Sequence, residues 1–193
     1  MEIDAIRSQF HEAAGSYGGW HGRCAERLVA LTRIARGDRV LDVGSGTGSA
    51  ARATLQRVGP TRAVVGIDIA EAMVDRARRD VPDADFVVGA AATLPFAQAS
   101  FRVVVCSSAI FYLPIQRAMR EWARVLVPGG VCVFSTMATD SPRLGVLVRQ
   151  VAARHGVRLV NPNGIGRPGE CARLLSSAAF GVPDVREEEI FGD

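Results

Sequence analysis

Three glycines and two acids give the clearest chemical signal in this sequence. Gly44, Gly46 and Gly48 alternate with other residues directly after a short apolar run, and Asp42 lies just before them. Asp68 ends the next apolar run. Because glycine has no Cβ, the backbone can turn sharply at these positions and a ligand can approach it closely. A strand, a glycine turn, a helix and a second strand that ends in an acid are typical of a nucleotide-type site at the carboxyl ends of parallel strands.

Two classes of cofactor fit this layout. A dinucleotide site favours the spacing G-x-G-x-x-G, whose glycines bring the backbone close to a pyrophosphate. The spacing here is G-x-G-x-G, and Ser49 stands where the third dinucleotide glycine would be. Asp42 would place a carboxylate beside the pyrophosphate anion, whereas it suits a positively charged ligand. S-adenosylmethionine carries a sulfonium and an ammonium and no phosphate, so we favour it, with an NAD-dependent oxidoreductase as the weaker alternative.

The segment 40–48 resembles motif I of the class I S-adenosylmethionine-dependent methyltransferases. Residues 124–130 resemble a helix end and turn of the same family, and residues 8–17 are similar to its ubiquinone/menaquinone-biosynthesis-like, small-molecule branch. The resemblance implies an enzyme that transfers a methyl group from S-adenosylmethionine, leaving S-adenosylhomocysteine. It also implies that the acceptor is a small or lipophilic molecule with an O, N or C nucleophile.

The predicted cofactor contacts combine the glycine turn with residues at the following strand ends. Asp68 matches the acid that holds the ribose hydroxyls in this family, and Ser107 falls at a strand end that faces the reacting methyl group. Met73 is expected either to border the adenine or simply to pack in the core. The residues expected to bind the cofactor are Asp42, Gly44, Ser45, Gly46, Gly48, Asp68, Ile69, Met73, Ala90, Ala91, Ser107 and Tyr17.

The elements that must position these residues alternate between strand and helix, which predicts an α/β fold. The family resemblance implies a Rossmann-like, doubly wound, mainly parallel sheet of order 3-2-1-4-5 then 6, with helices on both faces. We expect the family's seventh, antiparallel strand to be missing, because no residues remain for it. The expected strands are 40–43, 63–68, 85–88, 101–107, 131–135 and 185–190. The expected helices are 3–14, 20–34, 47–58, 70–79, one beginning near 114, 141–155 and 170–179.

The N-terminal residues 1–36 form a predicted helical lid segment, and residues 37–193 form the Rossmann-like domain, giving one domain overall. The family resemblance implies that this segment folds over the cofactor, with Tyr17 near the methionine end. Alternatively, Phe10 and Tyr17 only pack the first helix onto the domain.

One position departs from the family pattern at the expected adenine site. The family usually places an acid after Gly89, where it accepts a hydrogen bond from the adenine amino group, and this chain has Ala90. Loss of one such bond removes about 0.5–1.5 kcal/mol. Backbone atoms of Ala90 and Ala91 could still contact the adenine edge. Ala90 and the missing strand favour one further alternative, a non-catalytic S-adenosylmethionine-binding or scaffold domain.

The sequence assigns no general base and no metal site. The weak candidates for a base are His11, Tyr17, His21 and Tyr112, each of which fits a structural role more readily. The four cysteines are far apart, and no cluster of His, Cys and Asp has metal-ligand spacing.

The composition indicates which kinds of binding partner and which cellular location to expect. The net charge is +3 and all 23 basic residues are arginines, scattered along the chain, so we expect no nucleic-acid partner and attribute the arginine bias to a GC-rich, bacterial genome. No apolar run is long enough to span a membrane, and the N-terminus does not resemble a signal peptide. We therefore expect a cytoplasmic protein, as a monomer or as a homodimer joined through an exposed sheet edge.

Overall fold

The computed structural model describes residues 3–15, 19–59, 63–137 and 166–178, together with residues 180, 181, 184 and 186. These residues fall into two compact units, one up to Ser135 and the other from Thr136 onward. The expected helix 141–155, almost all of the expected strand 185–190 and the question of a seventh strand lie outside the described residues. The domain boundary expected after residue 36 stays a prediction.

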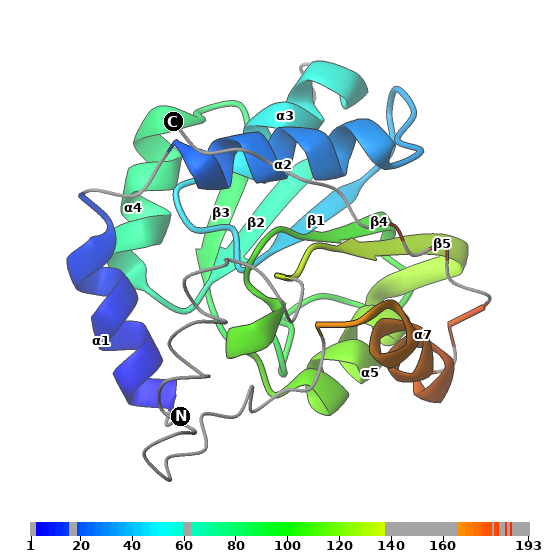
Figure 1. Cartoon of the computed structure of the whole chain (residues 1–193). Helices are drawn as coiled ribbons and strands as arrows, with labels where there is room; N and C mark the ends of the chain where they lie inside the picture. Colours follow the sequence, from blue (N-terminus) through cyan, green and yellow to red (C-terminus); the bar gives the residue numbers. More distant parts are fainter. Residues whose placement is uncertain are drawn as a thin grey trace, which may run out of the picture. The chain divides into compact units, whose positions relative to one another are not determined.

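A five-stranded parallel sheet forms the centre of the first unit (Figure 1). Its strand order, β3-β2-β1-β4-β5, is the predicted one. The central strand β1 pairs with β2 on one side and with β4 on the other, so the strand order reverses beside it. Ligands of such sheets bind at this reversal, outside the carboxyl ends of the strands. The strands are β1 (Val40–Val43), β2 (Val64–Asp68), β3 (Asp85–Val88), β4 (Phe101–Cys106) and β5 (Leu126–Phe134).

The helices of the first unit lie near their predicted positions. The main difference is at the end of α2, where the prediction extends to Ile34 and the helix stops at Leu31. Thr32 adopts an extended conformation there, and its Oγ1 donates a hydrogen bond to the Leu28 carbonyl at 2.7 Å. The helical elements are α1 (Ile3–Ala13), α2 (Trp20–Leu31), α3 (Ser49–Val58), α4 (Glu71–Asp80), the 3-10 turn η1 (Ile110–Tyr112) and α5 (Ile115–Val125).

The fifth strand begins earlier than the sequence predicts. The prediction places a turn at 128–130 before a strand at 131–135, but β5 already begins at Leu126. Phe101 pairs with Leu126 and Val103 pairs with Val131. Residues 127–130 of β5 therefore lie opposite the single residue Arg102 of β4 and bulge out of the ladder. The expected turn is therefore an irregularity inside one strand.

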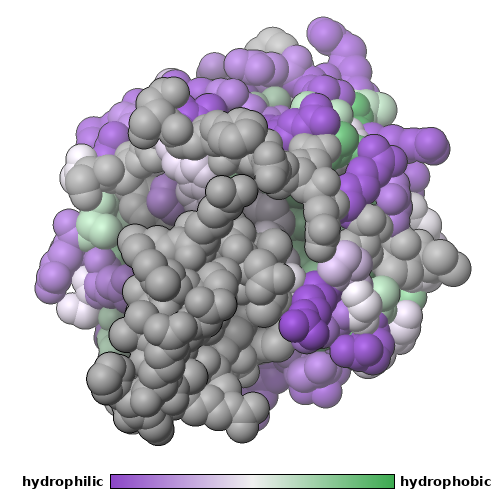
Figure 2. Space-filling view, in the orientation of Figure 1, coloured by the Kyte–Doolittle hydropathy of each residue, from purple (hydrophilic) through white to green (hydrophobic). Residues whose placement is uncertain are grey.

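Helices cover both faces of the sheet, as predicted. Helices α2, α3 and α4 share one apolar core with the sheet, and α5 lies on the opposite face (Figure 1). Trp122 of α5 is completely buried. Among the described atoms in the space-filling view, hydrophilic residues dominate (Figure 2). By solvent exposure, the exposed large apolar side chains of the described residues are Leu31, Val88 and Met137. The amphipathic helices thus turn their apolar sides to the sheet.

The described part of the second unit contains one helix, α7 (Pro168–Ser177). Its start is capped by Glu170, whose carboxylate accepts hydrogen bonds at 3.0 Å from the backbone N–H groups of Gly166 and Arg167. The helix predicted over 170–179 therefore begins two residues earlier than expected, because proline suits the first helical position.

A glycine in β2 provides a test of this packing. An ideal Cβ on Gly66 would lie 2.4 Å from Cδ1 of Phe86 on the adjacent strand β3. We expect Gly66→Ala to lower the free energy of unfolding by about 1–3 kcal/mol, because overpacking forces core side chains out of their preferred rotamers. Urea unfolding followed by circular dichroism measures the change.

The control for this substitution is Gly22→Ala in α2, where a Cβ would meet no heavy atom within 4 Å. Alanine there should stabilise the protein by about 0.5–1 kcal/mol, since glycine is a poor helix former. A Gly66→Ala protein as stable as the wild type would contradict the tight packing of β2 against β3.

Candidate functional site

The turn between β1 and α3 has the backbone geometry that its glycines suggested. Gly44, Gly46 and Gly48 have φ angles of 68°, 52° and 86°, in the left-handed region that residues with a Cβ rarely adopt. Gly44 also lies against Ala109, whose Cβ would be 2.5 Å from a Cβ at this position. The turn is thus held close to the loop that follows β4.

Gly48 packs against other residues than Gly44 and Gly46 do. It precedes α3, and a Cβ there would lie 3.0 Å from Val81 and 3.1 Å from Phe86. These contacts place Gly48 against the apolar core rather than the site. The glycine at this position permits close packing of the first turn of α3, and Gly48 does not line the pocket described below.

The carboxylate of Asp68 fastens the glycine turn to the end of β2. Its Oδ2 accepts a hydrogen bond from the Gly46 N–H at 2.8 Å, and its Oδ1 accepts one from the Ala70 N–H at 2.9 Å. Burial raises the pKa of Asp68, and the two backbone N–H groups oppose this shift. One side chain therefore positions both the turn and the start of α4.

Asp42 is a buried acid with one oxygen left without a partner. Its side chain is 1% exposed, and Oδ2 accepts a hydrogen bond from the Ala51 N–H at 3.0 Å. Oδ1 is buried and has no hydrogen-bond partner among the described residues. Burial raises the pKa of Asp42 to about 7, and the nearby negative charge of Asp68 adds to the shift. An unpaired buried carboxylate is costly, so this site favours either a proton or a bound cation.

A pocket opens directly above this turn, at the carboxyl ends of the strands. Two more polar atoms of its lining, Ser45 Oγ and Ser107 Oγ, are also buried without a partner among the described residues. The lining residues are Ile6, Phe10, His21, Ala25, Asp42, Gly44, Ser45, Gly46, Thr47, Ser49, Ala50, Ile67, Asp68, Ile69, Met73, Gly89, Ala90, Ala91, Ala92, Ser107, Ser108, Ala109, Tyr112, Leu113 and Pro114.

Part of the pocket lining is apolar and aromatic. Ile6 and Phe10 come from α1, whereas Tyr112 and Leu113 come from the turn after β4. The rings of Phe10 and Tyr112 meet edge to face with centroids 4.9 Å apart, a favourable arrangement for aromatic pairs. Burial raises the pKa of Tyr112. The first helix and the η1 turn thus build one wall together.

The pocket brings together most of the residues that the sequence singled out. Tyr17 lies outside the described residues, and His11 lies on the surface beside α4 rather than in this pocket. Of the candidates for a base, His21 and Tyr112 line the pocket. The predicted cofactor residues that line it are Asp42, Gly44, Ser45, Gly46, Asp68, Ile69, Met73, Ala90, Ala91 and Ser107.

Several lining residues were not anticipated. Thr47 lies inside the glycine motif, so its signal was present in the sequence. Ser108 follows Ser107 at the same expected strand end, and it is buried at φ 54°, an uncommon angle for a residue with a side chain. Its N–H donates to Ser135 Oγ at 3.0 Å, which ties the end of β4 to the end of β5. Only the folded strands bring these two serines together.

Within 3–15, 19–59, 63–137 and 166–178, no three side chains of His, Cys, Asp or Glu are grouped as a metal site would require. No helix in this part of the chain has the length and apolarity needed to cross a membrane.

The comparisons with known proteins identify the family. Residues 40–130 match the family model of a methyltransferase domain. The ubiquinone/menaquinone biosynthesis C-methyltransferase UbiE of Methylobacterium nodulans is 38% identical over 187 residues, covering 84% of this chain and 74% of that protein. The biotin biosynthesis bifunctional protein BioHC of Cellvibrio japonicus is 43% identical over 138 residues, or 68% of this chain and 27% of that protein. A solved S-adenosylmethionine-dependent methyltransferase from Mesorhizobium loti is 32% identical with a TM-score of 0.53, covering 59% of this chain and 54% of that chain.

The chain therefore belongs to the class I S-adenosylmethionine-dependent methyltransferases, as motif I predicted. S-adenosylmethionine is the cofactor of this family. The chain spans less than two thirds of the length of most curated relatives that it matches.

The pocket fits this cofactor on chemical grounds. The unpartnered oxygen of Asp42 suits the ammonium or sulfonium charge, and the unpartnered hydroxyls of Ser45 and Ser107 can bond to its polar groups. A pyrophosphate would meet two carboxylates, Asp42 and Asp68, on the same lining. The observation thus favours a cationic ligand over a dinucleotide.

The raised pKa of Asp42 predicts that cofactor affinity depends on pH. Protonated Asp42 cannot pair with a cation, and its folded pKa is about 7. Affinity for S-adenosylhomocysteine should therefore fall about tenfold for each pH unit below 7, as the carboxylate fraction falls. Below pH 7, where the affinity is expected to fall, the ligand's own ammonium is almost fully protonated, because α-amino groups titrate at about 7.7–8.0. Calorimetric titration between pH 5.5 and 7.5 measures the dependence.

The matched control is Asp42→Asn, which keeps the shape of the side chain but cannot ionise. Its affinity should be weak at pH 7.5 and nearly constant down to pH 5.5. A wild-type affinity that does not change over this range would show that the Asp42 carboxylate does not pair with the ammonium of the ligand, which is the cation that S-adenosylhomocysteine carries.

Proposed function

We propose that this chain transfers a methyl group from S-adenosylmethionine to a small or lipophilic acceptor. The observation that carries the proposal is the mixed lining of one pocket. Buried polar atoms of Asp42, Ser45 and Ser107 that have no hydrogen-bond partner among the described residues lie at the carboxyl ends of the strands. Apolar and aromatic side chains from α1 and the η1 turn complete the lining, which suits a ligand with little charge.

The residues at the strand ends hold the cofactor in this proposal. S-adenosylmethionine, when bound, supplies a methyl group already activated by its sulfonium. Asp42 balances the positive charge, and Asp68 accepts from the ribose hydroxyls while it keeps the turn in place. Met73 and the chain at Ala90 and Ala91 border the adenine. These residues bind and orient, and such orientation supplies about 7–11 kcal/mol of the barrier in favourable cases.

The acceptor is proposed to lie against the aromatic wall. Phe10 and Tyr112 exclude water from that part of the pocket, and the segment 1–36 acts as its cover. His21 and Tyr112 are the candidates for a base that line the pocket, and His21 is the better one, because burial raises the pKa of Tyr112 and so disfavours its phenolate. A base is needed only when the acceptor must lose a proton to become a nucleophile. A homodimer joined through a sheet edge stays a prediction, as does the absence of a nucleic-acid partner.

A non-catalytic role for the same site is the second candidate. It is favoured by the loop Gly89–Ala92, which contributes no carboxylate to the pocket and so lacks the usual acceptor for the adenine amino group. Such a domain would bind S-adenosylmethionine without turnover. Binding alone therefore does not separate the two functions.

A screen of acceptors separates them. We expect incubation with S-adenosylmethionine and a panel of quinols, phenols, carboxylic acids and amines to give one product heavier by a methyl group, together with S-adenosylhomocysteine. Mass spectrometry detects both products. Tight cofactor binding without any S-adenosylhomocysteine release across the panel would favour the binding domain instead.

Removal of the Asp68 carboxylate tests the cofactor site directly. Asp68→Ala should weaken binding of S-adenosylhomocysteine by well over tenfold, because a hydrogen bond to a charged group contributes about 1.5–3 kcal/mol and the bonds from the Gly46 and Ala70 N–H groups are lost as well. Calorimetry measures the affinity. Asp38→Ala is the matched control, since Asp38 accepts a comparable bond from the Ala35 N–H at 2.8 Å outside the pocket. Equal affinities of the two variants would contradict the assignment.

A further inference from the structure

One wall of the pocket is built from backbone and methyl groups alone. Gly89, Ala90, Ala91 and Ala92 line it, and none of them has a side chain that can reach or adjust to a ligand. The shape of this wall therefore depends on where the backbone of the loop lies. Whatever holds that backbone decides how well the wall fits the cofactor.

The start of this loop is tied to the sheet. The Gly89 N–H donates to the Asp68 carbonyl at 2.8 Å, directly beside the carboxylate that organises the glycine turn. The Thr93 N–H donates to the Ala90 carbonyl at 3.1 Å and closes a turn over the alanines. Neither bond fixes the far end of the loop, where Leu94 and Phe96 follow.

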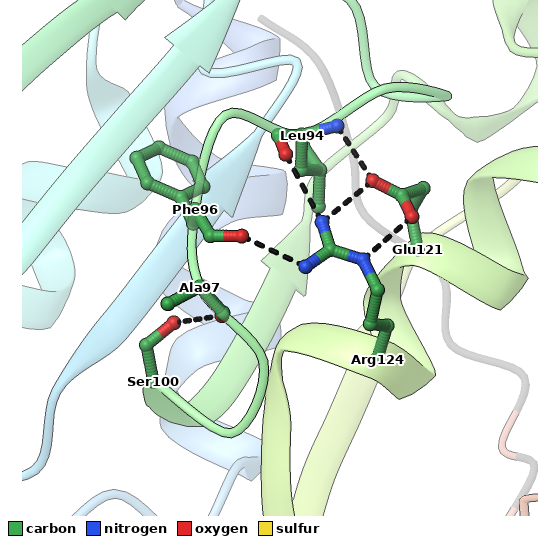
Figure 3. Close-up of polar contacts among 6 residues, drawn as sticks. All are labelled: Leu94, Phe96, Ala97, Ser100, Glu121 and Arg124. Atoms are coloured by element: carbon green, nitrogen blue, oxygen red, sulfur yellow. Dashed lines mark hydrogen bonds and ion pairs between the residues drawn. The ribbon is translucent and has the colours of Figure 1, made fainter.

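Two residues of α5 hold that far end (Figure 3). Glu121 Oε2 accepts a hydrogen bond from the Leu94 N–H at 2.7 Å. The Arg124 guanidinium donates to the Leu94 carbonyl at 3.0 Å through Nη2 and to the Phe96 carbonyl at 2.8 Å through Nη1. Three backbone groups of the loop are thus bound by two side chains from a helix that lies far along the chain.

The two side chains also hold each other. Arg124 donates to both carboxylate oxygens of Glu121, at 2.7 Å from Nε and at 2.8 Å from Nη2. This bidentate pair is partly buried, with side-chain exposures of 35% for Arg124 and 22% for Glu121. Charge-assisted bonds of this geometry are about twice as strong as neutral ones. The pairing fixes both side chains in the orientation that the loop backbone requires.

We infer that Glu121 and Arg124 are positioning residues of the cofactor pocket, which hold the loop Gly89–Phe96 so that its backbone forms the adenine wall. Neither residue lines the pocket. The inference rests on the proposed function, because it takes the cofactor to lie against Ala90 and Ala91. Helix α5 thereby contributes to cofactor affinity, although it lies far along the chain from the glycine turn after β1.

A purely stabilising role makes different predictions. If Glu121 and Arg124 only stabilised the fold, their loss would lower the free energy of unfolding and leave the affinity of the folded protein unchanged. If they position the loop, affinity and local amide exchange change in the folded protein. Arg102 provides the comparison, because its guanidinium also holds a backbone carbonyl, that of Gly129, and does not line the pocket.

The experiment measures S-adenosylhomocysteine affinity by calorimetry and amide exchange of residues 89–96 without ligand. Arg124→Met and Glu121→Ala should each weaken binding about tenfold, the equivalent of one charge-assisted hydrogen bond. The double variant should lose little more than either single variant, because the two side chains act as one unit. Amide exchange at Leu94 should be about tenfold faster in all three variants. Its N–H loses the acceptor Glu121, or Glu121 loses the Arg124 guanidinium that holds it in place.

The control variant Arg102→Met should bind the ligand within about twofold of the wild type, since its contact lies outside the loop. Arg124→Lys keeps the charge, but an ammonium cannot donate to the two carbonyls and to Glu121 with the same geometry. This variant should fold and bind S-adenosylhomocysteine about threefold more weakly. If Arg124→Met does not fold, this variant decides the outcome.

Wild-type affinity in the folded Arg124 variants, or equal losses in the Arg102 and Arg124 variants, would overturn the inference. A wild-type protein that does not bind S-adenosylhomocysteine would instead overturn the proposed function. The exchange of residues 89–96 needs no ligand and would still report whether Arg124 holds the loop.

Discussion

The site depends on one carboxylate that joins two strand ends. Asp68, at the end of β2, accepts from the N–H groups of both Gly46 and Ala70. This ties the turn after β1 to the start of α4 and brings a second acid, Asp42, close enough to raise its pKa further. A buried carboxylate, Asp42, and a partly buried one, Asp68, at the point where the strand order reverses make the site suited to a cation. The glycine turn, the pocket and its electrostatics all follow from this arrangement.

Around that centre the protein assembles walls of different chemical character. The strand ends contribute buried polar atoms that have no partner in the described part of the chain, and α1 with η1 contributes an aromatic surface. The loop after β3 contributes only backbone and methyl groups, and α5 holds it from behind through Glu121 and Arg124. A site of this kind orients two reactants more than it provides reactive groups, which agrees with a cofactor that carries the activated group itself.

Sequence reasoning succeeded where a local pattern has one structural meaning. The α/β fold followed from the alternation of strands and helices, and the strand order followed from the family that motif I resembles. It was less successful where a pattern has two meanings. Gly48 belongs to the same motif as Gly44 but packs against Val81 and the core. The Pro-Gly-Gly segment reads as a turn, yet it is a bulge within β5, because pairing with β4 continues on both sides.

The sequence by itself determined the family and the acid–glycine turn, because their motifs consist of residues close together in the chain, and the family in turn implied the strand order. Tertiary structure alone decided which candidates share a pocket, placing His21 and Tyr112 on it and His11 elsewhere. It also decided the pKa of Asp42, since burial rather than residue type causes the shift. The contacts of Arg124 with Leu94 and Phe96 bridge 30 and 28 residues. No local pattern encodes a contact of that range, so only the folded chain reveals it.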